Sequence, residues 1–154
     1  MNTILREATI KDFDALSELQ QNLVKFERPF DKGIPQSGKV CYYDIMKLIN
    51  DKNTLFIAAE TNNEIIGCGF GQIRNNLEWA VEKKIGYIGL MIIKEKYRRK
   101  NTGRLIIEKL IDYFRGKKIS NIILETYCIN TKAIEAYKKY GFKEFVLQMK
   151  YDTN

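Results

Sequence analysis

The sequence contains no histidine among its 154 residues. This absence excludes Ser-His-Asp and Cys-His hydrolases, histidine-ligated zinc and histidine general bases. The three cysteines, Cys41, Cys68 and Cys128, are odd in number, far apart and show no C-x-x-C spacing. They predict neither a disulfide framework nor a thiolate metal site, so no metal is expected. Free thiols of this kind favour the reducing cytoplasm as the location.

Long apolar runs are also missing. No segment is long and apolar enough to cross a bilayer. Residues 1–9 alternate polar and apolar side chains and include Arg6 and Glu7, so they lack the apolar core of a signal peptide. We therefore expect no membrane partner.

Proline is rare, and its placement is informative. The two prolines, Pro29 and Pro35, both fall within residues 28–39, together with two glycines. This composition predicts one internal loop. The chain as a whole is 45% apolar and 29% charged, which fits a single globular domain over residues 1–154. Lys and Arg outnumber Asp and Glu by 26 to 19, and the resulting charge of +7 predicts an anionic ligand.

Apolar spacing predicts an alternation of helices and strands. Strands are expected at 55–59, 64–73, 85–93, 122–127 and 142–151, and helices at 12–26, 43–49, 102–116 and 130–140. The turn sequence Thr61-Asn62-Asn63 predicts a hairpin between the first two of these strands. A strand–helix–strand unit from 85 to 127 implies a right-handed crossover to a parallel neighbour. Together these elements predict an α/β (α+β) fold, with a mixed sheet and helices on both faces.

A strongly basic turn leads from the strand at 85–93 into the helix at 102–116. Six of the eleven residues from Lys94 to Arg104 are Lys or Arg. A helix N-terminus offers free backbone N–H groups and a positive dipole end, so this turn suits a phosphate group. A solvated basic loop is the plainer alternative on composition alone.

Two motifs resemble those of the GNAT superfamily of acyl-CoA-dependent N-acyltransferases. The turn contains Arg98-Arg99-Lys100-Asn101-Thr102-Gly103, which is similar to the signature [Q/R]-x-x-G-x-[G/A], with Asn101 in place of the central glycine. The second is Asn130-x-x-Ala133-x-x-Ala136-Tyr137-x-x-x-Gly141-Phe142. Both lie in the C-terminal half, while the first half agrees in element order. The resemblance implies a mostly antiparallel GNAT-like sheet with a central parallel strand pair.

The resemblance also implies acetyl-CoA as cosubstrate. Met91, Ile92 and Ile93 would offer main-chain groups to its pantetheine arm where two parallel strands separate. The pyrophosphate would lie on the turn that follows. The implied cofactor-binding residues of that turn and of the second motif are Arg98, Arg99, Lys100, Asn101, Thr102, Gly103, Arg104 and Asn130.

Tyr137 matches the family's usual general acid, which returns a proton to the departing CoA thiolate. The alternative is that Tyr137 only packs in the core, because Ala133, Ala136 and Tyr140 recur at the same helical spacing.

No Asp or Glu lies within the strand at 85–93, so the sequence does not identify a general base. Carboxylates elsewhere that the fold could bring near are Glu27, Asp44, Glu78 and Glu82, and the sequence does not rank them. The resemblance implies an acceptor site walled by the first two helices and their connection, where Phe26, Glu27 and Tyr42, with Tyr87 on the strand, suit a cationic amine.

One further motif and one cysteine do not indicate a catalytic or binding role. The run Gly67-Cys68-Gly69-Phe70-Gly71 lies inside a strand and precedes no helix, so we interpret its glycines as allowing close approach of backbone and side chains. Cys128 has no histidine to deprotonate it, which favours an apolar packing role.

Three functions remain to be compared. The first is an N-acetyltransferase that moves an acetyl group to a primary amine, either a small molecule or a peptide, by direct attack on the thioester. The second is a non-catalytic acyl-CoA-binding module, suggested by Asn101 and by the missing base. Nucleic-acid binding is the third and is not expected, because the basic turn has only Tyr97 as an interleaved aromatic residue. Edge strands such as 142–151 could pair two subunits in a homodimer.

Overall fold

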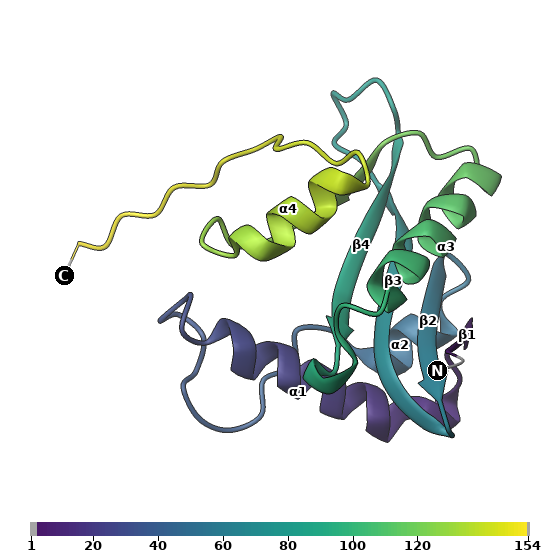
Figure 1. Cartoon of the computed structure of the whole chain (residues 1–154). Helices are drawn as coiled ribbons and strands as arrows, with labels where there is room; N and C mark the ends of the chain where they lie inside the picture. Colours follow the sequence, from purple (N-terminus) through teal and green to yellow (C-terminus); the bar gives the residue numbers. More distant parts are fainter. Residues whose placement is uncertain (1–2, 154) are drawn as a thin grey trace.

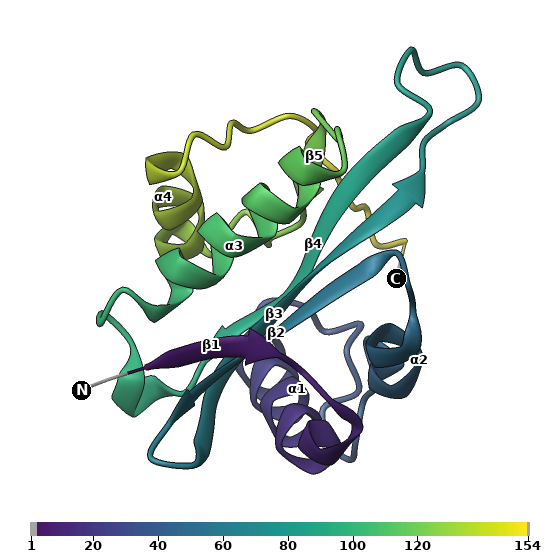
Figure 2. The same cartoon turned by 90° about the vertical axis from the view of Figure 1, so that its right-hand side faces the viewer.

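A five-stranded sheet forms the middle layer of the molecule, with strand order β1-β2-β3-β4-β5 (Figures 1 and 2). The computed structural model describes residues 3–153. The first four strands are antiparallel, and β5 runs parallel to β4, as the crossover predicted. The strands are β1 (Ile4–Glu7), β2 (Thr54–Thr61), β3 (Glu64–Asn75), β4 (Lys84–Ile93) and β5 (Ile122–Leu124).

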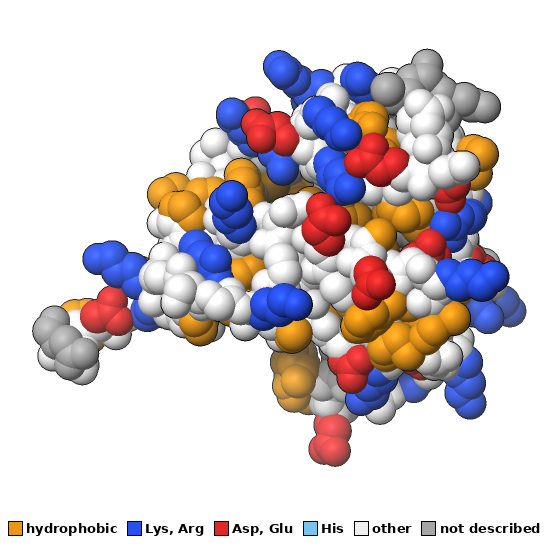
Figure 3. Space-filling model, turned by 90° about the horizontal axis from the view of Figure 1, so that it is seen from below, with side chains coloured by type: hydrophobic (Ala, Val, Ile, Leu, Met, Phe, Trp, Pro, Cys, Tyr) orange, Lys and Arg blue, Asp and Glu red, His pale blue; other side chains and the backbone are white. Residues whose placement is uncertain are grey.

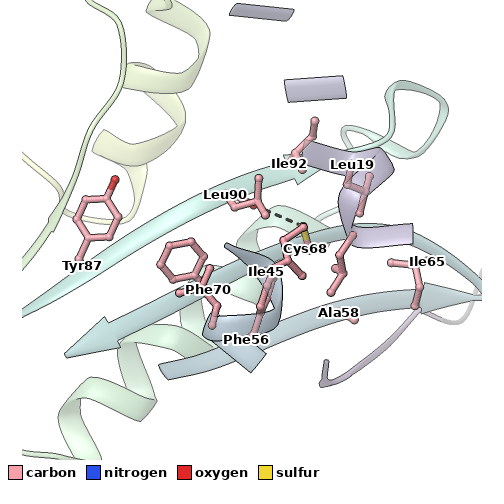
Figure 4. Packing of buried hydrophobic residues seen from close by; sticks show 12 residues of the cluster. Leu19, Ile45, Phe56, Ala58, Ile65, Cys68, Phe70, Tyr87, Leu90 and Ile92 are labelled. Atoms are coloured by element: carbon pink, nitrogen blue, oxygen red, sulfur yellow. Dashed lines mark hydrogen bonds between the residues drawn. The ribbon is translucent and has the colours of Figure 1, made fainter. Parts of the chain in front are cut away.

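Helices cover both faces of this sheet, which confirms the predicted fold class. On one face, α1 (Phe13–Glu27) and α2 (Ile45–Asn50) pack against Phe56, Cys68 and Phe70 (Figure 4). On the other, α3 (Thr102–Gly116) buries Ile106, Leu110 and Phe114 against the sheet. The remaining helices are α4 (Thr131–Lys139) and the 3₁₀ turns η1 (Ile10–Asp12) and η2 (Glu95–Tyr97). Within residues 3–153, none of these helices combines the length and the apolar character that a membrane span requires.

An ion-pair cluster fixes the start of the chain to the sheet. The Arg6 guanidinium donates to both carboxylate oxygens of Asp12 at 2.8 Å, and its Nε donates to Glu60 at 2.8 Å. The hydrogen bond from Arg6 holds the pKa of Asp12 at about 2, below its ordinary 3.8. These contacts attach β1 and the start of α1 to β2.

Gly69 and Gly71 of β3 lie under α3, and Gly67 lies against Ile92 and Ile93 of β4, as the interpretation of the Gly67–Gly71 run requires. A Cβ built on Gly71 would lie 2.8 Å from the Phe114 ring, and one on Gly86 in β4 would also meet that ring at 2.8 Å. The Phe114 side chain is fully buried. The small residues therefore let α3 approach the sheet closely.

The prediction of a final strand at 142–151 is wrong for this structure. After α4 the chain is extended but pairs with no strand, and it leaves the body of the molecule (Figure 1). The predicted strand at 122–127 is shorter, ending at Leu124. Without a neighbour on its outer side β5 keeps only the ladder to β4, so the parallel pair lies at the edge of the sheet and not at its centre.

We predict that Gly71→Ala destabilises the protein because its new methyl group overlaps the buried Phe114 ring. The expected loss is roughly 1–3 kcal/mol in the free energy of unfolding, measured by urea denaturation. Gly116→Ala is the matched control, since a Cβ there meets nothing within 4 Å. Equal stability of the two variants would contradict the packing account.

Candidate functional site

The parallel strands β4 and β5 separate after a short ladder. Gly86 pairs with Ile122 and Ile88 with Leu124, and β4 continues to Ile93 without a β5 partner. A bulge interrupts the other side of β4 close to this point, where its register against β3 shifts and Leu90 has a φ of 49°. The buried Cys68 thiol donates to the Leu90 carbonyl at 3.6 Å (Figure 4). Past Ile88, one edge of β4 is thus open.

The register shows which main-chain groups face this open edge. The Lys94 N–H donates to the Ile66 carbonyl at 2.8 Å. Because antiparallel pairing alternates along a strand, Ile92 turns its N–H and C=O toward β3, whereas Met91 and Ile93 turn theirs toward the open side. Arg98 Nε already uses the Ile93 carbonyl, at 2.9 Å. We therefore keep Met91 and Ile93 as candidates for a pantetheine arm and no longer expect main-chain contacts from Ile92.

The basic turn adopts a backbone that suits an anion. Arg99 and Asn101 have φ values of 61° and 62°, and Asn101 is the N-cap residue of α3. Asparagine tolerates this left-handed conformation better than most residues, so Asn101 fills the position of the family's glycine without a break in the turn. The first backbone N–H groups of α3 have no partner within the helix and point at this spot. Around it stand Arg98, Arg99, Lys100 and Arg104, all exposed.

A residue that sequence reasoning missed anchors this turn. Glu64, at the start of β3, accepts a hydrogen bond from the Tyr97 hydroxyl at 2.7 Å and pairs with Lys94 Nζ at 3.0 Å and Lys96 Nζ at 3.3 Å. The bond from Tyr97, followed by the one from Lys94, lowers the pKa of Glu64 to about 2. Glu64 is 33 residues from Tyr97 in sequence, so no local pattern could have indicated the contact.

A cleft of about 740 Å³ lies between α3 and α4 and begins at the turn. Its volume is within the range of small-molecule sites. In the turn beside it, Thr102 is buried and Gly103 is half-buried. The cleft is lined by basic, apolar and acidic side chains that include Arg104, Lys132, Lys139, Ile107 and Tyr140.

Helix α4 begins where it was predicted to begin, with Asn130 as its N-cap residue. The Asn130 side chain accepts the Ala133 N–H at 3.3 Å, so it caps the helix. Gly141, with a φ of 92°, ends the helix. The cap uses only the side-chain oxygen, so the cofactor-binding role that the resemblance implies for Asn130 stays a prediction.

Tyr137 lies on the inner side of α4, half-buried. Its ring packs edge-on against Phe142 with centroids 6.0 Å apart, and its hydroxyl has no hydrogen-bond partner in the described part of the chain. Burial raises the pKa of this hydroxyl to about 12, and the Glu27 charge adds to the effect. Tyr137 is therefore a neutral phenol with a free O–H at any physiological pH.

Glu27, the last residue of α1, is surrounded by tyrosines. Its charge raises the pKa of the Tyr42, Tyr43, Tyr127 and Tyr137 hydroxyls, which places it near all four. Burial raises the pKa of Glu27 itself above its ordinary value. The Tyr42 hydroxyl is buried and closes no hydrogen bond of good geometry within residues 3–153. This arrangement leaves a half-buried carboxylate among phenol hydroxyls, and the Tyr42 hydroxyl offsets part of the effect of burial on the pKa of Glu27.

A row of hydrogen-bonded polar side chains connects the start of α2 to β4 and to the residue after β5. The hydroxyls of Tyr43 and Tyr87 are 3.0 Å apart, and Tyr87 donates to Glu125 at 3.3 Å. Arg74 stacks on the Tyr87 ring, 3.6 Å from its centroid. Burial and the bond from Tyr43 raise the pKa of Tyr87. Sequence reasoning selected Tyr87 but missed Glu125, whose position just after a parallel strand was the available signal.

The aromatic wall of the site comes from α1 and the loop that follows it. Phe26 packs edge-on against Phe30 at 5.2 Å, and Phe30 meets Tyr127 at 5.9 Å. The Tyr127 hydroxyl donates to Asp31 at 3.2 Å, which ties the loop to the chain after β5. The Arg98 guanidinium lies 5.5 Å from the Phe26 centroid, so the basic turn and this wall are neighbours.

The structure ranks the carboxylates that the sequence could not. Asp44 accepts the Lys47 N–H at 3.0 Å and is the N-cap of α2. Glu78 and Glu82 lie in the projecting loop between β3 and β4 (Figure 2). Of the four, only Glu27 lies among the site tyrosines.

A family model agrees with this geometry. The Acetyltransferase (GNAT) family model matches residues 19–142. The chain belongs to the GNAT acetyltransferase family. The match includes both the basic turn and the α4 motif, so the GNAT resemblance of the two motifs is confirmed.

Curated relatives of this GNAT chain are distant. It is 25% identical to the N-alpha-acetyltransferase 30 of Dictyostelium discoideum, over 80% of this chain and 63% of the relative. It is 27% identical to an N-alpha-acetyltransferase of Sulfurisphaera tokodaii, over 67% of this chain and 65% of the relative. The chain thus spans a little under two thirds of these relatives' length.

Solved structures share the GNAT fold. A mutant BH1408 protein from Bacillus halodurans superimposes with a TM-score of 0.88 at 20% identity, covering 98% of this chain and 99% of that one. A predicted acetyltransferase from Clostridium acetobutylicum, crystallised with acetyl-CoA, gives 0.71 at 22% identity, covering 98% and 96%.

We predict that Tyr97→Phe weakens acetyl-CoA binding, because the turn loses its hydrogen bond to Glu64. Because Glu64 is partly exposed to solvent, the loss should be modest, and Kd should rise several-fold in calorimetry. Tyr113→Phe is the control, since the Tyr113 hydroxyl is buried without a partner among the described residues. Unchanged affinity in Tyr97→Phe would show that the anchor is not needed.

Proposed function

We propose that this GNAT chain transfers an acetyl group from acetyl-CoA to a primary amine by direct attack of the amine on the thioester. The observation that carries the proposal is the meeting of three features at one place. The open edge of β4 and the basic turn lie on one side, and the Glu27–tyrosine group with Tyr137 lies on the other. An anionic cosubstrate and a cationic acceptor would approach from opposite sides.

The main chain of β4 would bind and orient the acetyl donor. Acetyl-CoA, when bound, supplies the thioester. The N–H groups of Met91 and Ile93 face the open edge and can donate to the amides of the arm and to the thioester oxygen, which gains negative charge during attack. The first N–H groups of α3 and the arginines of the turn would hold the pyrophosphate.

Protons would move through two side chains. The Glu27 carboxylate accepts one from the acceptor ammonium, which frees a lone pair on nitrogen. As the new C–N bond forms and the C–S bond breaks, the nitrogen releases its second proton to solvent and becomes the amide nitrogen. Tyr137 donates its proton to the departing thiolate and is later reprotonated from solvent. The raised pKa of Tyr137 keeps the phenol protonated before the step, and the raised pKa of Glu27 makes that carboxylate a stronger base.

The acceptor would be a cationic amine, either a small molecule or a peptide. Three carboxylates, Glu27, Asp31 and Glu125, gather near the aromatic wall of a chain whose overall charge is +7. Charged hydrogen bonds and cation–π contacts of this kind recognise ammonium groups. The names of the curated relatives favour an α-amino group.

The structure weakens the arguments for the alternative function, an acyl-CoA-binding module without catalysis. It was suggested by Asn101 in the glycine position, but Asn101 adopts the left-handed backbone that this position requires. It was also suggested by the missing base, for which Glu27 is now a candidate. We further propose that the chain acts as a single domain in the cytoplasm, without a nucleic-acid partner.

We predict that Tyr137→Phe lowers kcat roughly 10²–10⁴-fold while acetyl-CoA still binds, because only the proton donor is lost. Thiol release against a panel of amines measures kcat, and calorimetry measures binding. Tyr113→Phe should keep the native kcat. A native rate in Tyr137→Phe would assign this tyrosine to packing alone.

We predict that Glu27→Gln removes the acidic limb of the pH–rate profile. Because the pKa of Glu27 is raised above its ordinary value of 4.5, the native enzyme should lose activity as the pH falls through a point above that value. The variant should show a low rate without this limb. Glu82→Gln, on the projecting loop, should retain the native profile, and an unchanged limb in Glu27→Gln would exclude Glu27 as the base.

A further inference from the structure

One arginine lies beside the acceptor side of the site, and the proposed reaction does not use it. Arg74, near the end of β3, places its guanidinium over the Tyr87 ring, 3.6 Å from the ring centroid. The Tyr87 hydroxyl points away from the apolar side chains around Phe70 (Figure 4) and lies 3.0 Å from the Tyr43 hydroxyl and 3.3 Å from the Glu125 carboxylate. The Tyr87 ring therefore lies between a cation and the polar groups of the acceptor side.

Hydrogen bonds that begin at Asp51 fix the orientation of Arg74. The side-chain amide nitrogen of Gln72 donates to Asp51 at 2.9 Å, and the side-chain oxygen of Gln72 accepts the Arg74 Nε–H at 2.8 Å. The bond from Gln72 is the main cause that holds the pKa of Asp51 below its ordinary 3.8. Gln72 thus holds one edge of the guanidinium, and Tyr87 holds one of its faces.

The other edge of the guanidinium is open. Among residues 3–153, neither Nη atom of Arg74 takes part in a hydrogen bond or an ion pair. The residue is half-buried, so this edge is oriented and still accessible. The planar N–H fork of a guanidinium matches the two oxygens of a carboxylate, which it binds through two parallel hydrogen bonds.

The surrounding charges favour a carboxylate over a phosphate. Burial is the main cause that raises the pKa of the Tyr43 and Tyr87 hydroxyls, and among the nearby charges Glu125 raises both values further whereas Arg74 lowers both. Glu27 also acts on Tyr43. One cation among carboxylates neutralises a single negative charge, and a doubly charged phosphate would be repelled. On the side of the molecule that carries α1, acidic and basic side chains are interspersed, so no broad positive surface adds to Arg74 (Figure 3).

We infer that Arg74 binds a carboxylate of the acceptor, so that the acetylated amine belongs to a molecule that carries both charges. Such a molecule is an amino acid, or a peptide with an acidic residue near its amino end. The inference rests on the proposed acetyl transfer. The ammonium group would lie among Glu27 and the tyrosines, and the carboxylate would lie on Arg74. Amines of the same shape without a carboxylate would leave this arginine unpaired and would be poorer acceptors.

Pairs of acceptors that differ only in charge test the inference. Amino acids with increasing separation of amine and carboxylate, and short peptides with Asp or Glu as the second residue, are each compared with the corresponding carboxamide. Thiol release gives kcat/KM. We expect a carboxylate acceptor to exceed its carboxamide roughly tenfold, the effect of one hydrogen bond to a charged group, and the two series distinguish the sources of the carboxylate.

Arg74→Gln should abolish this preference and leave kcat/KM for the carboxamides native. Arg74→Lys keeps the charge without the planar fork and should retain part of the preference. Equal kcat/KM within every pair of acceptors, or equal losses on both members of a pair in Arg74→Gln, would overturn the inference.

Lys84→Gln is the matched control. Lys84 precedes Ile85, the register partner of Arg74, so its side chain lies on the opposite face of the sheet. The variant removes the same single positive charge and should keep the native preference for carboxylates. An equal loss of preference in Lys84→Gln would assign the effect to net charge and would also overturn the inference.

A binding measurement distinguishes failure of this inference from failure of the proposed function. Side-chain ¹⁵N NMR follows the Nη signals of Arg74, assigned by their absence in Arg74→Gln, during titration with the same acceptors in the presence of desulfo-CoA. We expect carboxylate acceptors, and not carboxamides, to shift these signals. Shifted signals without any acetylated amine would contradict the proposed function and support the carboxylate site. Signals that no carboxylate acceptor shifts would overturn the site even if amines are acetylated.

Discussion

Beyond Ile88, β4 has a partner on one side only, and the rest of the site depends on this fact. Backbone N–H and C=O groups need hydrogen bonds, and a strand that leaves its neighbour keeps a row of unused groups. In this protein the row includes Met91 and Ile93, at the end of β4 that leads into the basic turn. The parting of two strands therefore creates a binding surface from main-chain atoms, without any special side chain.

Packing on the two faces of the sheet holds this parting open. The Phe114 ring lies over glycines of β3 and β4 and brings α3 close to the sheet, so that the start of α3 lies at the end of β4. On the other face, the Tyr43–Tyr87 pair fills the space at the parallel ladder with polar side chains. Glu64 then fixes the connecting turn. Each contact is ordinary, but together they hold the basic turn at the open end of β4 and beside the aromatic wall that begins at Phe26.

Local patterns predicted most of the fold. The helices α1 and α3 follow from apolar spacing, and Asn130 and Gly141 mark both ends of α4. Features that depend on distant contacts were not predictable: Glu64 meets Tyr97 across 33 residues, and Tyr87 meets Glu125 across 38. The strand at 142–151 failed for a related reason, because a strand needs a neighbour and the sequence does not say where that neighbour lies.

Amide hydrogen exchange at β4, followed residue by residue with and without acetyl-CoA, tests the central claim most directly. The account predicts that the Ile92 amide is protected in the free protein, because it pairs with β3, and that the Met91 and Ile93 amides exchange quickly until acetyl-CoA slows them. Met91 and Ile93 amides that are already protected in the free protein, or that do not respond to acetyl-CoA at saturating concentration, would contradict it.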